Sequence, residues 1–485
     1  HEATHGLVLS VLSLYCLMRF QRSARWLWIA GMGLCAGLVF LTKPESFVAI
    51  GPALVCGLAL TLCNQKASIA RMAAVGSAIT LCAAAPVLIA WMLLATAMPS
   101  MEALQGALGS WPFLTNRELT SLPFFAEVMG TDVLGENLLM VLVVMGKYLL
   151  VLVPAVLAGL LVSGRGLAPQ IVAVIGAAAV PAALLTIGRS DRAWYLVARP
   201  LPIFLAVAGV IIAIGILRHR RDDEHQLLRI LKLTLILWAE LLLLKIIALA
   251  RIEHYGFILA MPGMMLLVVM LMDWIPASVR TFGGSAMVVQ AAGLSLLGAI
   301  VWMQLYRMNS RLALRTQIIG KGADAMHVDA RGATLSQALA YLDAHMGPDQ
   351  TLLVMPEGIL INYLLRKDNP VPYLTFLPPD LLMFGEDRIL QDVKANPPDY
   401  LAIVDRPVFE FGKVAPGNDY AMSIMDYLLR NYDFRDKAVF GRVPYLVRAG
   451  EPAVGFGVMI APRKSESNAP QAGAASQPIG VLRPQ

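Results

Sequence analysis

Long apolar runs, most of them long enough to cross a membrane as a helix, alternate with short polar turns over the first 305 residues. A helix that crosses a bilayer needs about 20 mostly apolar residues. We therefore expect about ten spans, at 6–20, 26–41, 46–63, 69–97, 138–162, 169–187, 200–217, 230–250, 256–273 and 284–305. The pattern predicts a polytopic α-helical membrane domain.

After residue 305 the pattern becomes typical of a small water-soluble α/β domain. We expect helices at 336–345, 357–366, 387–394 and 420–431, and strands at 351–355, 400–404, 438–440 and 445–448. Such alternation favours a small parallel sheet. The tail is poor in bulky apolar residues, so we expect it to be disordered. The expected parts are a transmembrane domain at 1–305, the α/β domain at 306–463 and the tail at 464–485.

Basic residues in the short turns predict which side of the membrane each turn faces, because the cytoplasmic side of membrane proteins is enriched in Lys and Arg. The turns after the first, third, fifth and seventh expected spans carry these charges, among them Arg22, Lys66 and Arg165. The intervening turns then face the other side, and the tenth span leads there as well. We therefore expect a bacterial inner-membrane protein whose α/β domain is periplasmic.

Composition agrees with a membrane protein and excludes several function classes. Charged residues make up 15% of the chain, whereas a soluble protein has about 25%. The net charge of +6 does not indicate nucleic-acid binding, because the basic residues lie in membrane turns. All five cysteines lie in or beside apolar runs, so no disulfide framework or zinc site is expected in the α/β domain. No glycine-rich phosphate loop follows a strand, which argues against a nucleotide site.

Polar side chains at the expected periplasmic helix ends are candidates for binding a lipid phosphate or diphosphate headgroup. Arginine offers a planar fork to phosphate oxygens and lysine a point charge, and cations are not favoured on this side of the membrane. The alternative is that each cation only extends from a helix end towards the membrane surface. The candidates are Lys43, Arg192, Tyr195, Arg199, Arg251, His254 and Tyr255.

Two charged residues, Lys147 and Glu240, lie inside apolar runs. We expect Lys147 to lie about ten residues from the periplasmic end of its helix and Glu240 about eleven from its own, so that both are roughly 15 Å deep. An isolated charge at that depth costs on the order of 3 kcal/mol or more. We therefore expect a structural ion pair between them, with a substrate role as the alternative. Lys245 fits poorly as the partner of Glu240, because it lies about 140° further around the same helix.

The loop at 98–137 is long and mixes aromatic residues with carboxylates. Aromatic rings favour the level of the lipid headgroups, so we expect Trp111, Phe113, Phe124 and Phe125 at the bilayer surface. The loop is either a lid over a membrane-facing site or a plain amphipathic connector.

Several segments resemble a known family. The stretch GLCAGLVFLTKPESFVAIGPAL at Gly33–Leu54 resembles the G-L-x-x-L-T-K segment of GT-C glycosyltransferases, which include the protein O-mannosyltransferase and aminoarabinose-transferase groups. The stretches DRAWYLVARPLP and RIEHYGFILAMPG are similar to the Arg/Tyr-then-Pro helix starts of that superfamily. Residues 355–387 and 395–405 resemble the periplasmic C-terminal domain of its bacterial members. The resemblance covers nearly the whole chain.

The resemblance implies transfer of a sugar from a polyprenyl-phosphate-linked donor to a periplasmic or lipid acceptor. It places Glu2 as the catalytic acidic residue and matches Lys43 to the lysine of the L-T-K segment. The family's first periplasmic loop, which carries another acidic residue, has no counterpart here, so we expect the chain to be N-terminally truncated. In this chemistry a carboxylate deprotonates the acceptor hydroxyl, while Arg and Lys stabilise the departing phosphate.

Two other function classes stay open. A transporter or flippase of lipid-linked saccharides would show internal repeats with broken helices and polar sites at mid-membrane, and we find no such repeat. A non-catalytic membrane scaffold that displays the α/β domain is the third hypothesis. The expected partners are the lipid-linked sugar donor, a lipid or glycan acceptor and membrane lipids, without nucleic acid. No cofactor is certain, and a divalent cation would suit the phosphate chemistry.

Reporter fusions test the expected orientation. A reporter that is active only outside the cytoplasm should be active when fused after residue 463. The same reporter should be inactive when fused in the basic turn at 218–222, because basic turns stay in the cytoplasm. A cytosolic location of residues 306–463 would overturn the orientation and the sugar-transfer hypothesis with it.

Overall fold

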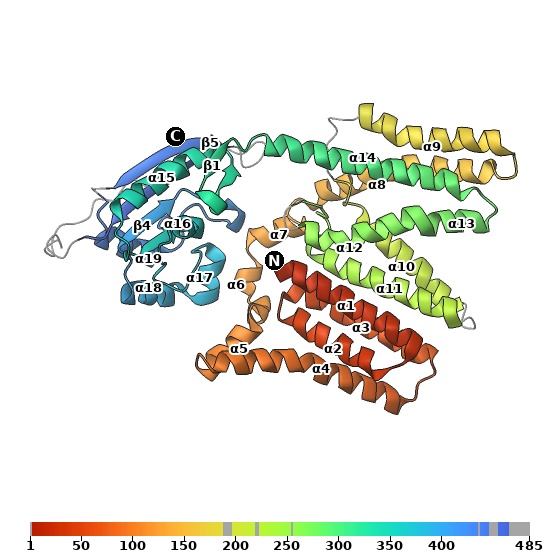
Figure 1. Ribbon diagram of the computed structural model, residues 1–485, viewed down its shortest axis with the longest axis horizontal. Helices are drawn as coiled ribbons and strands as arrows, with labels where there is room; N and C mark the ends of the chain where they lie inside the picture. The colour runs from red at the N-terminus through yellow and green to blue at the C-terminus, as the bar shows by residue number, and fades with distance from the viewer. Residues whose placement is uncertain are drawn as a thin grey trace. The chain divides into compact units, whose positions relative to one another are not determined.

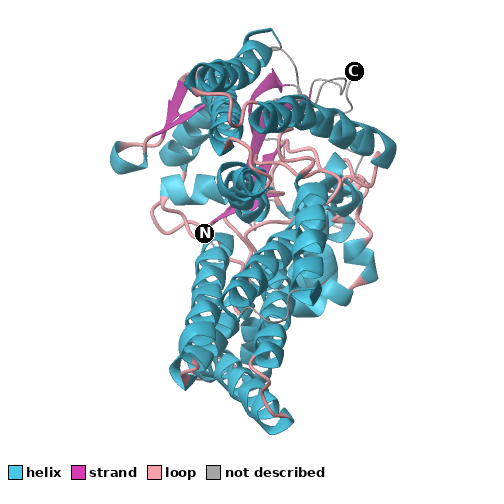
Figure 2. Cartoon of the chain, turned by 90° about the vertical axis from the view of Figure 1, so that its right-hand side faces the viewer, coloured by secondary structure: helices cyan, strands magenta, loops and turns pink. Residues whose placement is uncertain are grey.

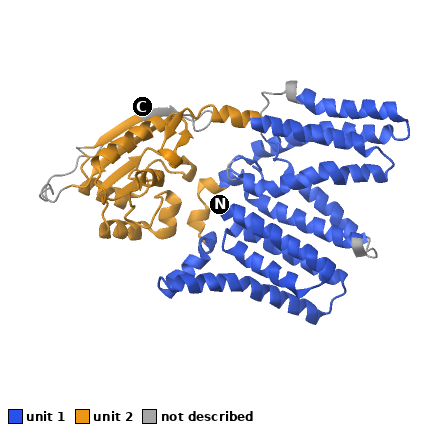
Figure 3. Ribbon diagram, in the orientation of Figure 1, with its two compact units in different colours: residues 1–115, 126–305 blue, residues 116–125, 306–485 orange. Residues whose placement is uncertain are grey.

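The protein forms two compact units in the computed structural model, which describes residues 2–187, 196–218, 223–253, 256–434, 437–445 and 454–464. The first unit comprises His1–Thr115 and Ala126–Leu305, and the second comprises Asn116–Phe125 and Tyr306–Gln485 (Figure 3). The inclusion of Asn116–Phe125 in the second unit was not expected from the sequence.

The first unit is helical, and each apolar run identified in the sequence forms a helix (Figure 1). The long helices are α1 (Glu2–Ser23), α2 (Trp26–Phe40), α3 (Pro44–Asn64), α4 (Ile69–Ala95), α8 (Leu134–Leu161), α9 (Leu167–Ile187), α10 (Leu201–Arg218), α11 (Asp223–Leu243), α12 (Gly256–Val269) and α14 (Ala286–Leu312). The shorter elements are α5 (Ser100–Leu108), η1 (Trp111–Thr115), α7 (Pro123–Met129), η3 (Leu244–Ile246), the π-helical η4 (Met270–Trp274) and α13 (Ile275–Thr281).

Eight helical stretches of the described residues are long and apolar enough to cross a membrane. They contain α1, α3, α4, α8, α9, α10, α12 with α13, and α14. Helix α2 has only 15 residues, and α11 carries Arg229, Lys232 and Glu240. The architecture is that of a polytopic helical membrane protein, and the count of ten spans stays a prediction.

Glycines allow several of these helices to approach closely, as small residues do between helices in lipid. A Cβ atom at Gly37 of α2 would lie 2.1 Å from the carbonyl oxygen of Ala83 in α4. A Cβ atom at Gly57 of α3 would lie 2.3 Å from Oγ1 of Thr234 in α11. In α4 and α9, by contrast, only 6% of the residues in the apolar 18-residue stretch are buried inside the protein. The outer faces of these two helices therefore suit contact with lipid.

The second unit combines a mixed sheet with short helices. Its helical elements are α6 (Arg117–Thr120), η5 (Gly322–Asp324), α15 (Arg331–His345), α16 (Ile359–Leu365), α17 (Pro378–Phe384), α18 (Glu386–Ala395), η6 (Phe409–Phe411) and α19 (Met422–Asn431). Its strands are β1 (Gln317–Ile319), β2 (Met326–Val328), β3 (Leu352–Met355), β4 (Tyr400–Val404), β5 (Ala438–Tyr445) and β6 (Val454–Pro462), drawn in magenta in Figure 2.

The main sheet has the order β3-β4-β6-β5, and a separate antiparallel pair joins β1 to β2. Strands β3 and β4 are parallel, whereas β6 pairs antiparallel with both β4 and β5. The prediction of a parallel sheet is therefore wrong for β5 and β6. Only residues 446–453 separate these two strands, fewer than a parallel crossover connection needs. Strand β6 was missed because Gly455 and Gly457 weaken its sequence pattern. Of the predicted disordered tail at 464–485, Lys464 is described and residues 465–485 lie outside the described residues.

An apolar cluster of the second unit holds the segment Asn116–Phe125. The rings of Phe124 and Phe411 lie 5.4 Å apart, and Leu122 packs against the same cluster. Gly412 has a φ of 73°, and a Cβ atom there would lie 3.2 Å from Cγ of Pro123. Phe124 therefore packs against protein, where the sequence analysis placed it at the bilayer surface.

Replacing Phe124 with alanine tests this contact. Because the ring is half-buried, Phe124→Ala should destabilise the second unit by about 1–3 kcal/mol. Limited proteolysis of residues 306–464 during heating measures the change. Leu114→Ala is the matched control, because its side chain is 49% exposed. Equal resistance of both variants to protease would show that the aromatic contact contributes nothing.

Candidate functional site

Three segments of the first unit meet around one buried arginine. Nη1 of Arg199 donates to Oδ1 of Asn137 at 2.8 Å and to the carbonyl oxygen of Ala248 at 2.9 Å. The backbone N–H of Ala248 donates in turn to the carbonyl oxygen of Met129 at 3.1 Å. We call Asn137, Arg199, Ala248 and the neighbouring Arg251 the arginine site. Its segments are the start of α8, the turn before α10 and the connection after η3.

The arginine site contains more positive charge than its described partners neutralise. Arg199 is only 7% exposed, and burial, followed by the nearby charge of Arg251, lowers its pKa. Nε of Arg199 and Nε of Arg251 are both buried without a hydrogen-bond partner. Among the described residues, neither guanidinium forms an ion pair with a carboxylate. Buried charges are normally paired, so this arrangement suits an anion.

Local backbone geometry fixes the position of the Asn137 side chain, which accepts a hydrogen bond from Arg199. Gly130, just before α8, has a φ of 76°, and a Cβ atom there would lie 2.8 Å from Cβ of Leu249. A side chain at this position would therefore separate the two segments. The carbonyl of Gly130 accepts a 2.8 Å hydrogen bond from Nδ2 of Asn137. This bond orients the amide so that its oxygen faces Arg199.

A second polar cluster lies at the starts of α1 and α3. Glu45, in the first turn of α3, forms an ion pair with Lys245 of η3. A Cβ atom at Gly6 of α1 would lie 2.7 Å from Oγ of Ser46, so the first turns of α1 lie beside the start of α3. The exposed Glu2 and the N-cap residue Lys43 therefore lie at the same end of these helices.

The connection from η3 to Arg251 links the two clusters. Its Lys245 pairs with Glu45, and three residues later Ala248 accepts from Arg199. The structure therefore brings Glu2, Lys43, Arg199 and Arg251 to one end of the helices of the first unit. Arg192, Tyr195, His254 and Tyr255 lie outside the described residues.

Trp111, from the long loop, packs beside the second cluster. Its ring stacks on Phe40 at 4.6 Å and meets Phe47 edge-on at 5.7 Å. Its Nε1 donates to the carbonyl oxygen of Phe40 at 3.1 Å. This ring packs against the α2–α3 connection, where the sequence analysis expected it at the bilayer surface.

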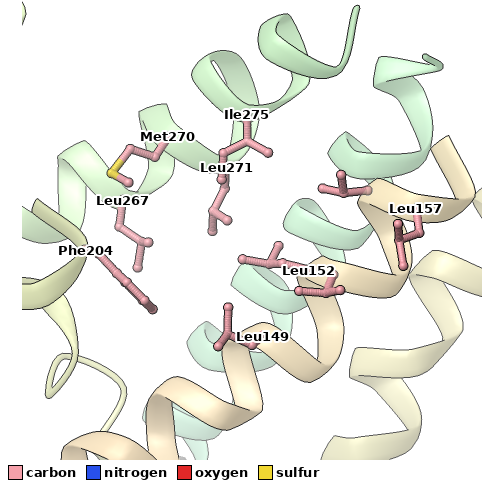
Figure 4. Close-up of a pocket in the computed structure, with 10 residues that line it drawn as sticks. Leu149, Leu152, Leu157, Phe204, Leu267, Met270, Leu271 and Ile275 are labelled. Carbon is pink, nitrogen blue, oxygen red and sulfur yellow. The ribbon is translucent and has the colours of Figure 1, made fainter. Parts of the chain in front are cut away.

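An apolar cavity of about 310 Å³ lies in the same unit, between α8, α10 and α12 to α13 (Figure 4). Phe204, in its wall, packs edge-on against Tyr148 at 5.3 Å, and the Tyr148 hydroxyl donates to the carbonyl of Val197. Because Phe204 follows Arg199 by five residues, the cavity begins within about 10 Å of that turn along the helix. The lining residues are Leu149, Leu152, Val153, Val156, Leu157, Phe204, Leu267, Met270, Leu271 and Ile275.

The two charges expected at mid-membrane lie at different depths. Lys147 lies in the middle of α8, but α11 ends at Leu243, so Glu240 is in the last turn of its helix and not about eleven residues from its end. Among the described residues no ion pair between Lys147 and Glu240 is seen, and Oε2 of Glu240 lacks a hydrogen-bond partner. The pairing stays a prediction.

Sequence reasoning missed Asn137 and Ala248. Asn137 follows Glu136 at a helix start, and many helices begin with such polar residues. Ala248 acts through its backbone carbonyl, which no side-chain pattern reveals. The nearest signal was the glycine at position 130 shortly before an apolar run.

No group of three or more His, Cys, Asp or Glu side chains that could hold a metal ion occurs in the part of the chain that the structure describes. No protein-family model, curated protein or solved structure matches the chain significantly. The functional argument therefore depends on the geometry of the chain itself.

A double-mutant cycle tests the contact between the second cluster and η3. Lys245→Met leaves Glu45 partly buried without its partner and should lower the melting temperature of the purified protein by several degrees. Glu45→Gln/Lys245→Met should recover part of that loss, because an uncompensated charge costs more than a neutral pair. Additive losses in the double variant would show that the pair contributes no stability.

Proposed function

We propose that the protein is a membrane glycosyltransferase that moves a sugar from a polyprenyl-phosphate-linked donor to a lipid or glycan acceptor. The observation that supports this most is the arginine site, where two guanidinium groups have no carboxylate partner among the described residues, together with an apolar cavity further along α8, α10 and α12. An anionic head joined to a hydrocarbon chain suits both parts. The resemblance of Gly33–Leu54 to GT-C enzymes gives independent support from the sequence.

The headgroup would bind at the arginine site. The two buried Nε–H groups of Arg199 and Arg251 are donors that lack acceptors. Phosphate oxygens are strong acceptors for guanidinium groups, and such charge-assisted bonds are roughly twice as strong as neutral ones. A bound phosphate would also offset the repulsion between the two arginines, so the occupied site would have a lower free energy than the empty one.

The hydrocarbon chain would lie in the apolar cavity. A cavity without polar lining atoms offers a sugar or peptide no hydrogen bond, whereas burial of each CH₂ group contributes about 0.8 kcal/mol. Part of a polyprenyl chain would fill the space between α8, α10 and α12, and the remainder would lie in the bilayer.

In the transfer itself, the acceptor hydroxyl oxygen attacks the anomeric carbon of the donor sugar. The bond between that carbon and the phosphate oxygen breaks, and the phosphate leaves with the electron pair. Glu2 would take the proton of the acceptor hydroxyl. Lys43, Arg199 and Arg251 would stabilise the negative charge on the leaving phosphate. Their location at one end of the helices supports this assignment.

The proposed location is the bacterial inner membrane, with this helix end and the C-terminal unit on the periplasmic side. The distribution of Lys and Arg among the turns supports the orientation. The second unit would then lie in the periplasm, where polyprenyl-linked sugars and glycan acceptors meet.

Sugar transfer in membranes that contain the full-length protein tests the proposal. With radiolabelled polyprenyl-phosphate sugars, we expect label to move to a lipid or glycan acceptor. Arg251→Gln should lower the rate by about tenfold to a hundredfold, because one charge on the leaving phosphate is lost. The matched control is Arg165→Gln, at an exposed turn of the same unit.

Two outcomes would contradict the proposal at different levels. No transfer from any lipid-linked sugar would exclude the enzymatic function. Transfer that survives Glu2→Ala, Lys43→Ala and Arg251→Gln unchanged would place the active site elsewhere.

A further inference from the structure

The acceptor that holds Arg199 is a neutral amide. Asn137 is buried, at 7% exposure, and its oxygen lies 2.8 Å from Nη1 of Arg199. The other described acceptor of Arg199 is the backbone carbonyl of Ala248, which is also neutral. A carboxylate is the usual partner of a buried arginine, since it cancels the charge. Here the guanidinium is oriented without being neutralised.

The surroundings of Asn137 favour an amide over a carboxylate of the same shape. Its Nδ2 donates to the carbonyl oxygen of Gly130 at 2.8 Å. An aspartate would place a negative oxygen against that carbonyl oxygen, and neither could donate. The positive φ of Gly130 and its tight packing against Leu249 fix this carbonyl in place. The backbone therefore selects a side chain that has one donor and one acceptor.

We propose that Asn137 is the specificity-determining residue of the arginine site, because its neutral amide leaves two positive charges available for a dianionic phosphate monoester. This inference rests on the proposed function and concerns its leaving group. A polyprenyl-phosphate-linked sugar is a monoanionic phosphodiester, whereas the polyprenyl phosphate that departs is a dianionic monoester, so the site favours the charge that develops as the sugar is transferred. Because neither arginine pairs with a carboxylate among the described residues, a ligand that carries two negative charges balances the site. A monoanionic diester leaves one charge unmatched, and an uncharged lipid leaves both.

Binding of alkyl phosphates to the purified full chain in detergent tests the role of Asn137. The probes are monododecyl phosphate, its methyl diester and dodecanol, at pH 8, where a phosphate monoester carries close to two negative charges because its second pKa is about 6. The wild-type protein should bind the monoester at least about fivefold more tightly than the diester, and dodecanol more weakly still. This comparison needs no variant.

Substitutions at position 137 separate charge from structure. Asn137→Asp should weaken monoester binding by about tenfold or more, because its carboxylate neutralises Arg199. Asn137→Ala should weaken it less, because Ala248 still holds the guanidinium and no negative charge is added. Dodecanol binding should stay the same in both. The matched control is Asn116→Asp, since Asn116 caps α6 through its side-chain oxygen and aspartate is an equally good cap.

The outcomes distinguish this inference from the proposed function. Two results would show that Asn137 is only a structural support. In the first, Asn137→Asp binds the monoester as tightly as the wild type does. In the second, Asn137→Ala weakens binding more than Asn137→Asp does. Equal wild-type affinity for monoester and diester overturns the inference even if the aspartate variant does not fold. If the wild type binds neither anionic lipid, then the lipid-phosphate part of the proposed function fails as well.

Discussion

A positive charge that is buried among helices must be matched by negative charge or by strong acceptors, and this constraint organises the first unit. Arg199 is buried at the start of α10 and has two neutral acceptors, while Arg251 adds a second positive charge nearby. An anion bound at this point would supply the negative charge that the described residues do not. An apolar cavity lies further along the same helices.

The packing of the helices makes this arrangement possible. Close approach at Gly57 brings α11 against α3, so the connection after α11 reaches both Glu45 and Arg199. Gly130 lets the turn before α8 approach the same connection and present Asn137. Each contact depends on a small residue or a backbone carbonyl, so modest changes in helix position would separate the polar groups.

The sequence predicts the helices well, because a run of apolar residues has few other stable structures in lipid. The long helices of the first unit, α1–α4, α8–α12 and α14, follow that rule, whereas the short helices α5 to α7 lie in the stretch that was expected to be a loop. The apolar pattern does not predict contacts between residues that are far apart in the sequence. Lys245 pairs with Glu45, which lies 200 residues away. The segment Asn116–Phe125 joins the second unit through Phe124. The depth of Glu240 was misjudged because α11 changes to a 3-10 turn at Leu244, where the sequence stays apolar. Strand β6 was missed because pairing with β4 and β5 overrides two glycines.

The most direct test of the central claim is photolabelling, in native membranes, with a phosphate monoester whose alkyl chain carries a diazirine. The label, mapped by mass spectrometry, should fall on the cavity walls, in the peptides that contain Leu149–Leu157 and Leu267–Ile275. An excess of unlabelled monoester should compete with it, and an excess of dodecanol should compete less well. Labelling spread evenly over the outward faces of α4 and α9, without competition, would show that the lipid is only solvent and would contradict a headgroup site at Arg199 and Arg251.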